Sequence, residues 1–278
     1  MTTGARVKSN AKQFARDAES SRVFEGVARA GYVANAVIHA LIGVIVIVIA
    51  SGGKGEGDQA GAMKAVAGAP AGFVVLWLIA IGLCALGVWH AAEGLLARDR
   101  SGDTKGAARK WGRRFAEWGQ SAVFLTLGLI SAAVAIGARP DADQTAEDAS
   151  RELMRIPGGS IVLAAIGLAI GVAGIAFVWM GVKRSFRARI RIPDGALGGW
   201  VTALGVVGFL AKGVALTSLG VLLMVSALVT DADAAGSLDG AVDAMLALPL
   251  GPALAWTIGI GFLAYAAFTV ARARLARM

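Results

Sequence analysis

Six long apolar runs constrain this sequence more than any other feature. A helix needs about 20 mostly apolar residues, at about 1.5 Å of rise each, to cross about 30 Å of hydrocarbon. Six segments meet that length, at residues 31–50, 71–96, 119–138, 160–182, 208–230 and 252–271. Strand alternation is nearly absent, and a bilayer requires each span to pair its own backbone N–H and C=O groups. The sequence therefore predicts an all-α integral membrane protein with a six-helix bundle.

The composition agrees with a chain surrounded by lipid. Hydrophobic residues make up 56% of the 278 residues and charged residues only 17%, whereas soluble domains carry about 25% charged residues. The net charge of +8 is spread over four segments that flank the apolar runs. We therefore predict contacts with anionic lipid headgroups and no binding of nucleic acid. One cysteine and two histidines are too few for a disulfide framework or an ordinary zinc site, so no metal is predicted.

The connections between the runs alternate in charge. Lysine and arginine fill the N-terminal tail, the second and fourth connections and the C-terminal end, whereas acidic residues dominate the third and fifth connections. Cytoplasmic loops carry the excess of Lys and Arg in membrane proteins. We therefore expect a multi-pass protein of the plasma (cytoplasmic) membrane, here a cell inner membrane, with both termini in the cytoplasm. The first run is longer than the 7–15 residues of a signal-peptide core, so it is predicted to remain as a span.

Three copies of one two-helix unit account for the even spacing of the runs. Glycine opens each odd span, at Gly31, Gly119 and Gly208, and a Pro-x-Gly motif precedes each even span, at Pro70, Pro157 and Pro249. Recurrence of such markers at a fixed period is the signature of tandem repeats. Because each unit crosses twice, the copies share one orientation. The sequence thus predicts three parallel tandem helical-hairpin repeats around a pseudo-threefold axis.

These markers divide the chain into predicted regions. The regions are a basic, partly interfacial cytoplasmic tail at 1–28, repeat 1 at 29–100, a cytoplasmic amphipathic linker at 101–118, repeat 2 at 119–190 and repeat 3 at 191–278. A short apolar series before each Pro-x-Gly motif predicts a small amphipathic helix in each outer loop. Trp111, Phe115 and Trp118 fall at helical spacing among arginines, which is typical of an interfacial anchor.

Small residues recur within the later spans. They are Gly167, Gly171, Gly174, Gly213 and Gly220. Glycines at such spacing let helices approach closely in lipid, where no hydrophobic force draws them together. We predict that these glycines serve helix packing within the molecule rather than a dimer interface.

The combined pattern resembles a known family. It consists of Gly31-Tyr32, then Gly43 twelve residues after Gly31, then Asp58-Gln59-x-Gly61-Ala62, then Pro-x-Gly and a second span, three times over. This resembles the bacterial, mostly actinobacterial, integral membrane family called domain of unknown function 1206. The resemblance implies a six-span inner-membrane protein and brings no established activity and no catalytic residues.

The copies differ at the positions that the family fills with an aromatic and a basic residue. The middle copy departs most, with Gln120 and Val123 there, whereas Lys212 keeps the basic position in the third copy and Asn35 replaces it in the first. Lys212 enters its span by only a few residues, so its ammonium group is expected to reach back to the cytoplasmic surface.

Polar residues within the first repeat form the candidate site. His39 and His90 each lie about 12 Å from the cytoplasmic ends of their helices, with Asn35 and Glu93 on the same helix faces. One reading is interhelical hydrogen bonding, as is common for polar residues in spans. A second is a proton or cation site. A third is a pair of axial ligands to haem b.

No enzyme motif accompanies these residues. A Gly-rich phosphate loop, HExxH and CxxC are all absent from the sequence. The leading interpretation is therefore a non-enzymatic scaffold or accessory subunit that associates with other membrane proteins. The alternatives are a small transporter or channel that uses the cluster of His39, His90, Glu93 and Asn35, and, third, a bis-histidine haem-binding electron carrier.

Overall fold

The computed structural model describes residues 22–96, 104–231 and 238–275. Its helices are α2 (Arg22–Ala50), α3 (Gln59–Ala67), α4 (Gly72–Leu96), α5 (Thr104–Ala135), α6 (Ala142–Met154), α7 (Gly159–Lys183), α8 (Ala196–Val229), α9 (Leu238–Leu246) and α10 (Gly251–Leu275), with a short 3-10 helix, η1 (Ser185–Arg189), after α7. The described part of the chain contains no strand, which confirms the predicted all-α class. Most of the predicted tail at 1–28 lies outside the described residues.

Six of these helices are long and apolar enough to cross a membrane, namely α2, α4, α5, α7, α8 and α10. This confirms the six predicted spans. The short helices α3, α6 and α9 each lie between the two spans of one repeat, immediately before its Pro-x-Gly motif. The chain is thus a multi-pass membrane protein of three helical hairpins, each with a small helix at its turn.

Helices α5 and α8 begin furthest before their apolar runs. Helix α5 begins at Thr104 and continues without a break through the predicted linker, and α8 begins at Ala196, before the predicted start at 208. Nothing in either stretch stops a helix, because glycine alone costs only about 1 kcal/mol within one. The prediction counted apolar residues only. A helix held by its own backbone hydrogen bonds can continue into polar and basic sequence, as α5 and α8 do.

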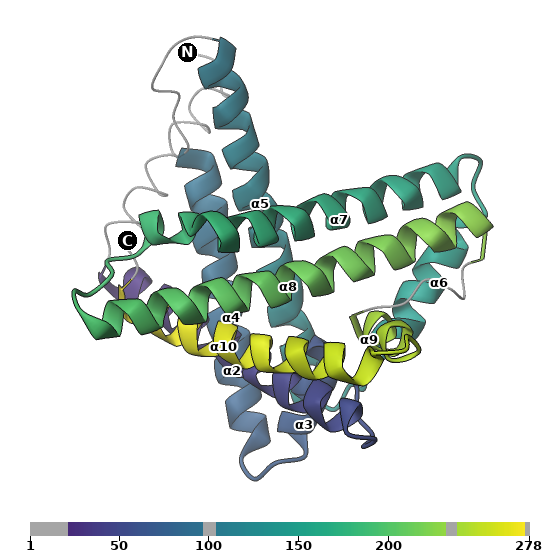
Figure 1. Cartoon of the computed structure of the whole chain (residues 1–278), viewed down its shortest axis with the longest axis horizontal. Helices are drawn as coiled ribbons and strands as arrows, with labels where there is room; N and C mark the ends of the chain where they lie inside the picture. Colours follow the sequence, from purple (N-terminus) through teal and green to yellow (C-terminus); the bar gives the residue numbers. More distant parts are fainter. Residues whose placement is uncertain (1–21, 97–103, 232–237, 276–278) are drawn as a thin grey trace.

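The six spans pack in a row, in the order α7, α8, α10, α2, α4, α5. The closest pairs join the second span of one repeat to the first span of the next, namely α4 with α5, α7 with α8 and α10 with α2. Within repeats 1 and 3 the two spans also pack, α2 with α4 and α8 with α10. In Figure 1, α4 and α5 stand upright, whereas α7 and α8 run across the view. Along the row, pairs between repeats alternate with pairs within repeats, which is the order that a threefold ring of hairpins requires.

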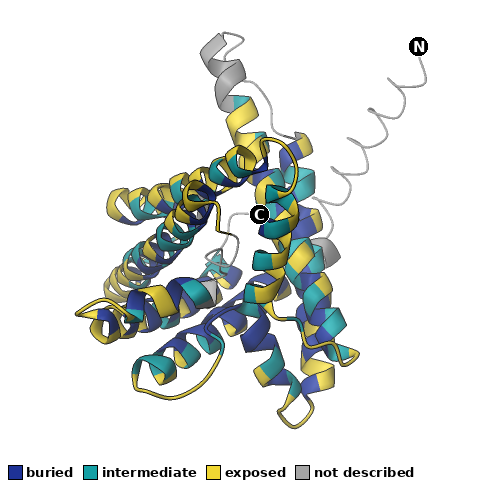
Figure 2. Ribbon diagram, turned by 90° about the vertical axis from the view of Figure 1, so that its right-hand side faces the viewer, coloured by how far each residue is buried: buried dark blue, intermediate teal, exposed yellow. Residues whose placement is uncertain are grey.

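The ring is open in repeat 2, because α5 and α7 are the two ends of the row and share no packed interface. Only 22% of the membrane window of α5 and 17% of that of α7 are buried, against 39–50% for the other four spans. Figure 2 shows buried residues where helices meet and exposed residues along their outer sides. We call this unpaired position the α5–α7 seam.

Close contacts between repeats recur at one repeat position. Gly43, Ser131 and Gly220 occupy it in the three copies. A Cβ added to Gly43 would lie 2.8 Å from the carbonyl oxygen of Gly259, and one added to Gly220 would lie 2.5 Å from the backbone nitrogen of Gly171. Ser131 instead donates a hydrogen bond of 3.0 Å to the carbonyl of Leu76. A small residue is therefore needed here, since each span lies directly on the backbone of its neighbour.

The predicted packing glycines lie along the interface of α7 with α8. A Cβ on Gly174 would lie 2.8 Å from the carbonyl oxygen of Gly213, and one on Gly167 would lie 2.9 Å from that of Gly220. Gly171 contributes its backbone, because a Cβ there would meet nothing within 4 Å. The stripe is used within the molecule.

The Pro-x-Gly motifs have one structural role in all three repeats. Each even span begins at the glycine, namely Gly72, Gly159 and Gly251. A Cβ at any of these glycines would collide with a carbonyl oxygen of the short helix before it, those of Val66, Leu153 and Leu246 respectively. The motif thus folds the short helix back against the first turn of the span, and only glycine fits the corner.

The main apolar core lies where α2, α3, α4 and α10 meet. Ile42, Met63 and Leu83 are fully buried there, and Phe262 lies against them. Helix α3 is therefore part of the core on one side, although the sequence predicted a helix at the surface of the outer loop. Repeats 1 and 3 form the compact part of the molecule, and α5 and α7 lie at its edges.

Candidate functional site

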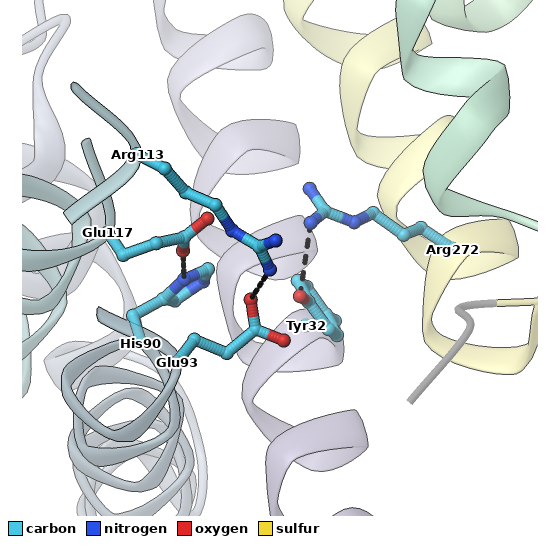
Figure 3. A network of polar contacts seen from close by, with 6 residues as sticks. All are labelled: Tyr32, His90, Glu93, Arg113, Glu117 and Arg272. Carbon is cyan, nitrogen blue, oxygen red and sulfur yellow. Dashed lines mark hydrogen bonds and ion pairs between the residues drawn. The ribbon is translucent and has the colours of Figure 1, made fainter. Parts of the chain in front are cut away.

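A buried hydrogen bond joins the first two repeats. Nδ1 of His90 on α4 lies 2.7 Å from Oε2 of Glu117 on α5. The two residues are only 3% and 2% exposed. Since a carboxylate can only accept, Nδ1 carries the hydrogen and donates it to Glu117. Figure 3 shows this contact across the two helices.

The second ring nitrogen of His90 has no such contact. Its Nε2 is buried and makes no hydrogen bond to any described residue. The ring stacks on Phe124, with 5.4 Å between centroids. With Nδ1 protonated, the neutral imidazole keeps a lone pair on Nε2, so this atom can accept a proton or another ligand.

A polar network surrounds this pair at the basic end of the bundle, where α2 and α5 begin and α4 and α10 end (Figure 3). Arg113 lies 3.5 Å from Glu93, and Arg272 donates a hydrogen bond of 3.1 Å to the hydroxyl of Tyr32. The guanidinium of Arg272 also lies 4.5 Å from the centre of the Tyr32 ring, a cation–π contact. These contacts link α4 with α5 and α10 with α2 at the same end of the bundle.

His39 belongs to a second site, between α2, α8 and α10. Its Nδ1 donates a hydrogen bond of 2.8 Å to the carbonyl of Asn35, which leaves Nε2 as an acceptor. Lys212 on α8 donates to that nitrogen at 3.1 Å. The imidazole also lies against Tyr265 of α10, with 4.8 Å between ring centroids. One neutral imidazole thus accepts from an ammonium group inside the bundle.

Aromatic rings hold the Lys212 ammonium group in place. Nζ lies 4.6 Å from the centre of the Tyr265 ring and 5.3 Å from that of Phe177. The prediction that Lys212 reaches back to the cytoplasmic surface is therefore wrong. Because α8 starts at Ala196, Lys212 lies in the middle of its helix, and an imidazole lone pair and two ring faces are its nearest partners.

The comparison with known families agrees with the repeat structure. The family model described as Domain of Unknown Function (DUF1206) matches residues 30–97, 118–184 and 207–276. The chain belongs to this family. The three matches confirm the family resemblance and the three tandem repeats.

This DUF1206 protein is also similar to a bacterial protein over most of its length. The chain is 21% identical over 246 residues to "Uncharacterized protein YxxB" of Bacillus subtilis (strain 168), which covers 87% of each chain. No solved structure matches the chain. The site therefore has to be interpreted from its own chemistry.

The structure separates the four residues that the sequence grouped. His39 faces α8 and α10, whereas His90 faces α5, so the two histidines lie on different helix interfaces. Asn35 contributes its backbone carbonyl, and Glu93 pairs with Arg113 beside His90. This arrangement does not place the two imidazoles as a pair of axial ligands for haem.

The most important partner, Glu117, was not among the predicted residues. The sequence interpretation assigned it to an interfacial linker, between Trp111 and Trp118, whereas the helix continues into the span. A signal was available, because Glu117 is the only acidic residue of α5. Tyr32 and Arg272 were missed because neither residue type is unusual near the end of a span.

The predicted interfacial anchor is an aromatic ladder on α5. The ring centroids of Trp111 and Phe115 are 5.8 Å apart, and those of Phe115 and Trp118 are 6.3 Å apart. Phe115 is 65% exposed, and the guanidinium of Arg114 lies 5.2 Å from the Trp111 ring. Exposed aromatic rings beside arginines suit the boundary between headgroups and hydrocarbon.

Acidic residues gather at the opposite end of the bundle. A cavity of about 350 Å³ is lined by Glu56, Asp58, Asp141, Ala142, Asp143, Gln144 and Glu147. Two of these carboxylates are helix caps, since Asp58 accepts from the N–H of Gly61 and Asp141 from that of Gln144. Among the described residues, no three His, Cys, Asp or Glu side chains are grouped to hold a metal ion.

Proposed function

We propose that the protein is a small transporter that carries protons across the plasma membrane and that His90 and Glu117 accept the proton. The observation that carries this proposal is the buried His90 ring, bound to Glu117 through Nδ1 and without a partner at Nε2. Ionisable residues within spans are costly and mark ion or proton pathways by default. This pair connects two helices rather than the turns of one.

Proton uptake changes the charge of the pair by one unit. With a neutral imidazole the pair carries the negative charge of Glu117 alone. When Nε2 takes up a proton, the imidazolium and the carboxylate face each other with no net charge. Inside a low-dielectric bundle this difference is large, because charges interact many times more strongly there than in water. Uptake would therefore change how firmly α4 holds α5.

Charged and polar side chains around the His90–Glu117 pair affect its uptake of a proton. Arg113 and Arg272 place positive charge beside the pair and Glu93 places negative charge there, while Tyr32 supplies a hydroxyl. At the second site Lys212 supplies a cation next to His39. The buried groups at the interfaces between repeats thus include both an acidic and a basic pair, and a proton pathway needs such ionisable groups.

The orientation belongs to the same proposal. The basic end of the bundle faces the cytoplasm and the acidic loops with α3, α6 and α9 face outside, in agreement with the positive-inside rule. The aromatic ladder on α5 and its arginines then contact anionic headgroups of the cytoplasmic leaflet. His90 and Glu117 lie near this side, so they exchange protons with the cytoplasm.

Proton flux into liposomes tests the proposal. Purified protein is reconstituted with a pH-sensitive dye inside the vesicles, and a pH step is applied. We expect flux above that of empty liposomes for the wild type, and its loss in Glu117→Gln and His90→Gln. Glu147→Gln, on the outer helix α6, is the matched control and should behave like the wild type. Absence of wild-type flux, or full flux in Glu117→Gln, rejects the proposal.

A scaffold or accessory subunit is the second candidate. It is favoured by the large exposed apolar residues on α7, among them Ile161, Val172 and Trp179. Such residues can contact either lipid or the span of another membrane protein. Purification in mild detergent separates the two functions, since a fixed partner in constant ratio, without flux, supports the scaffold.

A further inference from the structure

Equivalent glycines close the two packed repeats at the same register. A Cβ on Gly31 of α2 would lie 2.7 Å from Cβ of Leu86 on α4, and one on Gly208 of α8 would lie 2.5 Å from Cα of Tyr265 on α10. Leu86 and Tyr265 hold the same repeat position, sixteen residues after Pro70 and Pro249. The opening glycine of a repeat thus packs on the same point of its second span in both copies.

The equivalent contact is not made in repeat 2. Gly119 of α5 is the equivalent glycine, and a Cβ there would meet nothing within 4 Å. The equivalent point on α7, sixteen residues after Pro157, is Ala173, and it is exposed. Both small residues that would form the contact are present, but they do not meet.

We infer that α5 and α7 close on each other in the bilayer through Gly119 and Ala173, completing the ring of six helices. The surface of α5 at the seam therefore has the protein's own α7 as its partner. Small residues on both sides let the backbones approach, which is what holds helices together in lipid. The register is the one already used by Gly31 with Leu86 and by Gly208 with Tyr265.

Closure would also affect the polar network, although the inference does not depend on the proposed proton transport. Glu117 precedes Gly119 by two residues on the same helix. Moving α5 toward α7 therefore moves the carboxylate that holds His90. The open and closed seams are two arrangements of one ring, and they differ in how α5 lies relative to α4.

Cysteine cross-linking tests the inference. Cys84→Ser gives a background without cysteine, since Cys84 is the single one in the chain. Gly119→Cys with Ala173→Cys is then oxidised in native membranes, and the linked peptides are identified by mass spectrometry. A disulfide needs Cα atoms about 4.4–6.8 Å apart. We expect an intramolecular disulfide at a rate at least tenfold above that of the control pair.

Two controls set the scale. Gly119→Cys with Leu168→Cys places the second thiol on another face of α7, and this pair should remain mostly unlinked. Ala211→Cys with Gly261→Cys lies on the packed α8–α10 interface, where a Cβ on Gly261 would touch that of Ala211, and it should link readily. If the main pair does not insert, Val123→Cys with Ala169→Cys probes the seam one helical turn further along.

Each outcome decides the inference. An intramolecular link at either seam pair supports it. A link that appears only between two chains overturns it in favour of a second copy in the seam. Failure of both seam pairs, while the Ala211–Gly261 pair links, shows that the seam stays open or holds another molecule, and it also overturns the inference. Proton flux is not part of this readout, so the two proposals fail separately.

Discussion

Glu117 of α5 and His90 of α4 form a buried pair, with 2.7 Å between Oε2 and Nδ1, across the boundary between the first and second repeats. Neither position is repeated as such in the other copies, which have Arg29 and Val206 in place of Glu117 and Phe177 and Thr269 in place of His90. The repeats therefore share a helix framework, and the His90–Glu117 pair is present at only one interface of it. Function is expected to depend on that pair.

Replacing the two members of this pair should have unequal effects on stability. His90→Phe removes the Nδ1 donor from one side of a buried pair and should lower the free energy of unfolding by about 3–5 kcal/mol. Glu117→Leu leaves one N–H unpaired and should cost about 1–3 kcal/mol. The double variant should lose less than the sum, because both polar partners are gone. Denaturant titration in mild detergent measures all three, and strict additivity would contradict a direct pair.

The His39–Lys212 contact should show a rescue. His39→Leu removes the acceptor of the Lys212 ammonium group and should lower the free energy of unfolding by about 1.5–3 kcal/mol. Adding Lys212→Met should restore at least half of the loss, since the unpaired cation is removed as well. Val214→Met, at an exposed position on the same helix, is the control and should change stability by less than about 0.5 kcal/mol. A double variant with a lower free energy of unfolding than His39→Leu alone would refute the contact.

The interface of α7 with α8 should tolerate a side chain at one glycine and not at its neighbour. Gly220→Val adds a side chain where even a Cβ would lie 2.5 Å from the nitrogen of Gly171, and it should cost about 1–3 kcal/mol. Gly171→Val is the matched control, because its Cβ would meet nothing within 4 Å. Thermal unfolding of both variants in the same detergent compares them. Equal effects would place α7 and α8 in a different register.

The proposed orientation predicts which loops an impermeant reagent reaches. In the Cys84→Ser background, Ala149→Cys on α6 should react with a membrane-impermeant maleimide in intact cells. Ala188→Cys, after α7, should react only once the membrane is permeabilised. Both positions are exposed in the structure, so burial does not distinguish them. The reverse labelling pattern would invert the proposed topology and place the His90–Glu117 pair near the outer surface.

The spans and the repeats could be predicted because they depend on local properties. Twenty apolar residues have few alternatives to a membrane helix, and the Pro-x-Gly corner fixes where α4, α7 and α10 begin. The start of α5 could not be predicted in the same way, because its first residues are polar and basic. That error hid Glu117, which lies where the counted apolar run had not yet begun.

The candidate site was predicted only in part. The sequence identified His39 and His90 as polar residues at similar depth, and depth follows from counting residues along a helix. Their partners depend on helix rotation, which leaves no mark in a single sequence. Lys212 lies beside His39 because α8 packs on α10, which in turn packs on α2. Glu117 lies beside His90 because α5 packs on α4.

By itself, the sequence determined that this chain spans the membrane as three like-oriented helical hairpins. The length of an apolar run and the repeated glycine and proline markers set the extent of each helix locally. Only the tertiary structure decided which faces of the helices meet, and therefore that the histidines occupy two separate sites and that repeat 2 is open at the α5–α7 seam. The physical reason is that lipid satisfies every apolar face equally well. The choice of neighbour thus rests on the close fit of small residues and a few buried polar contacts, which exist only once the helices are assembled.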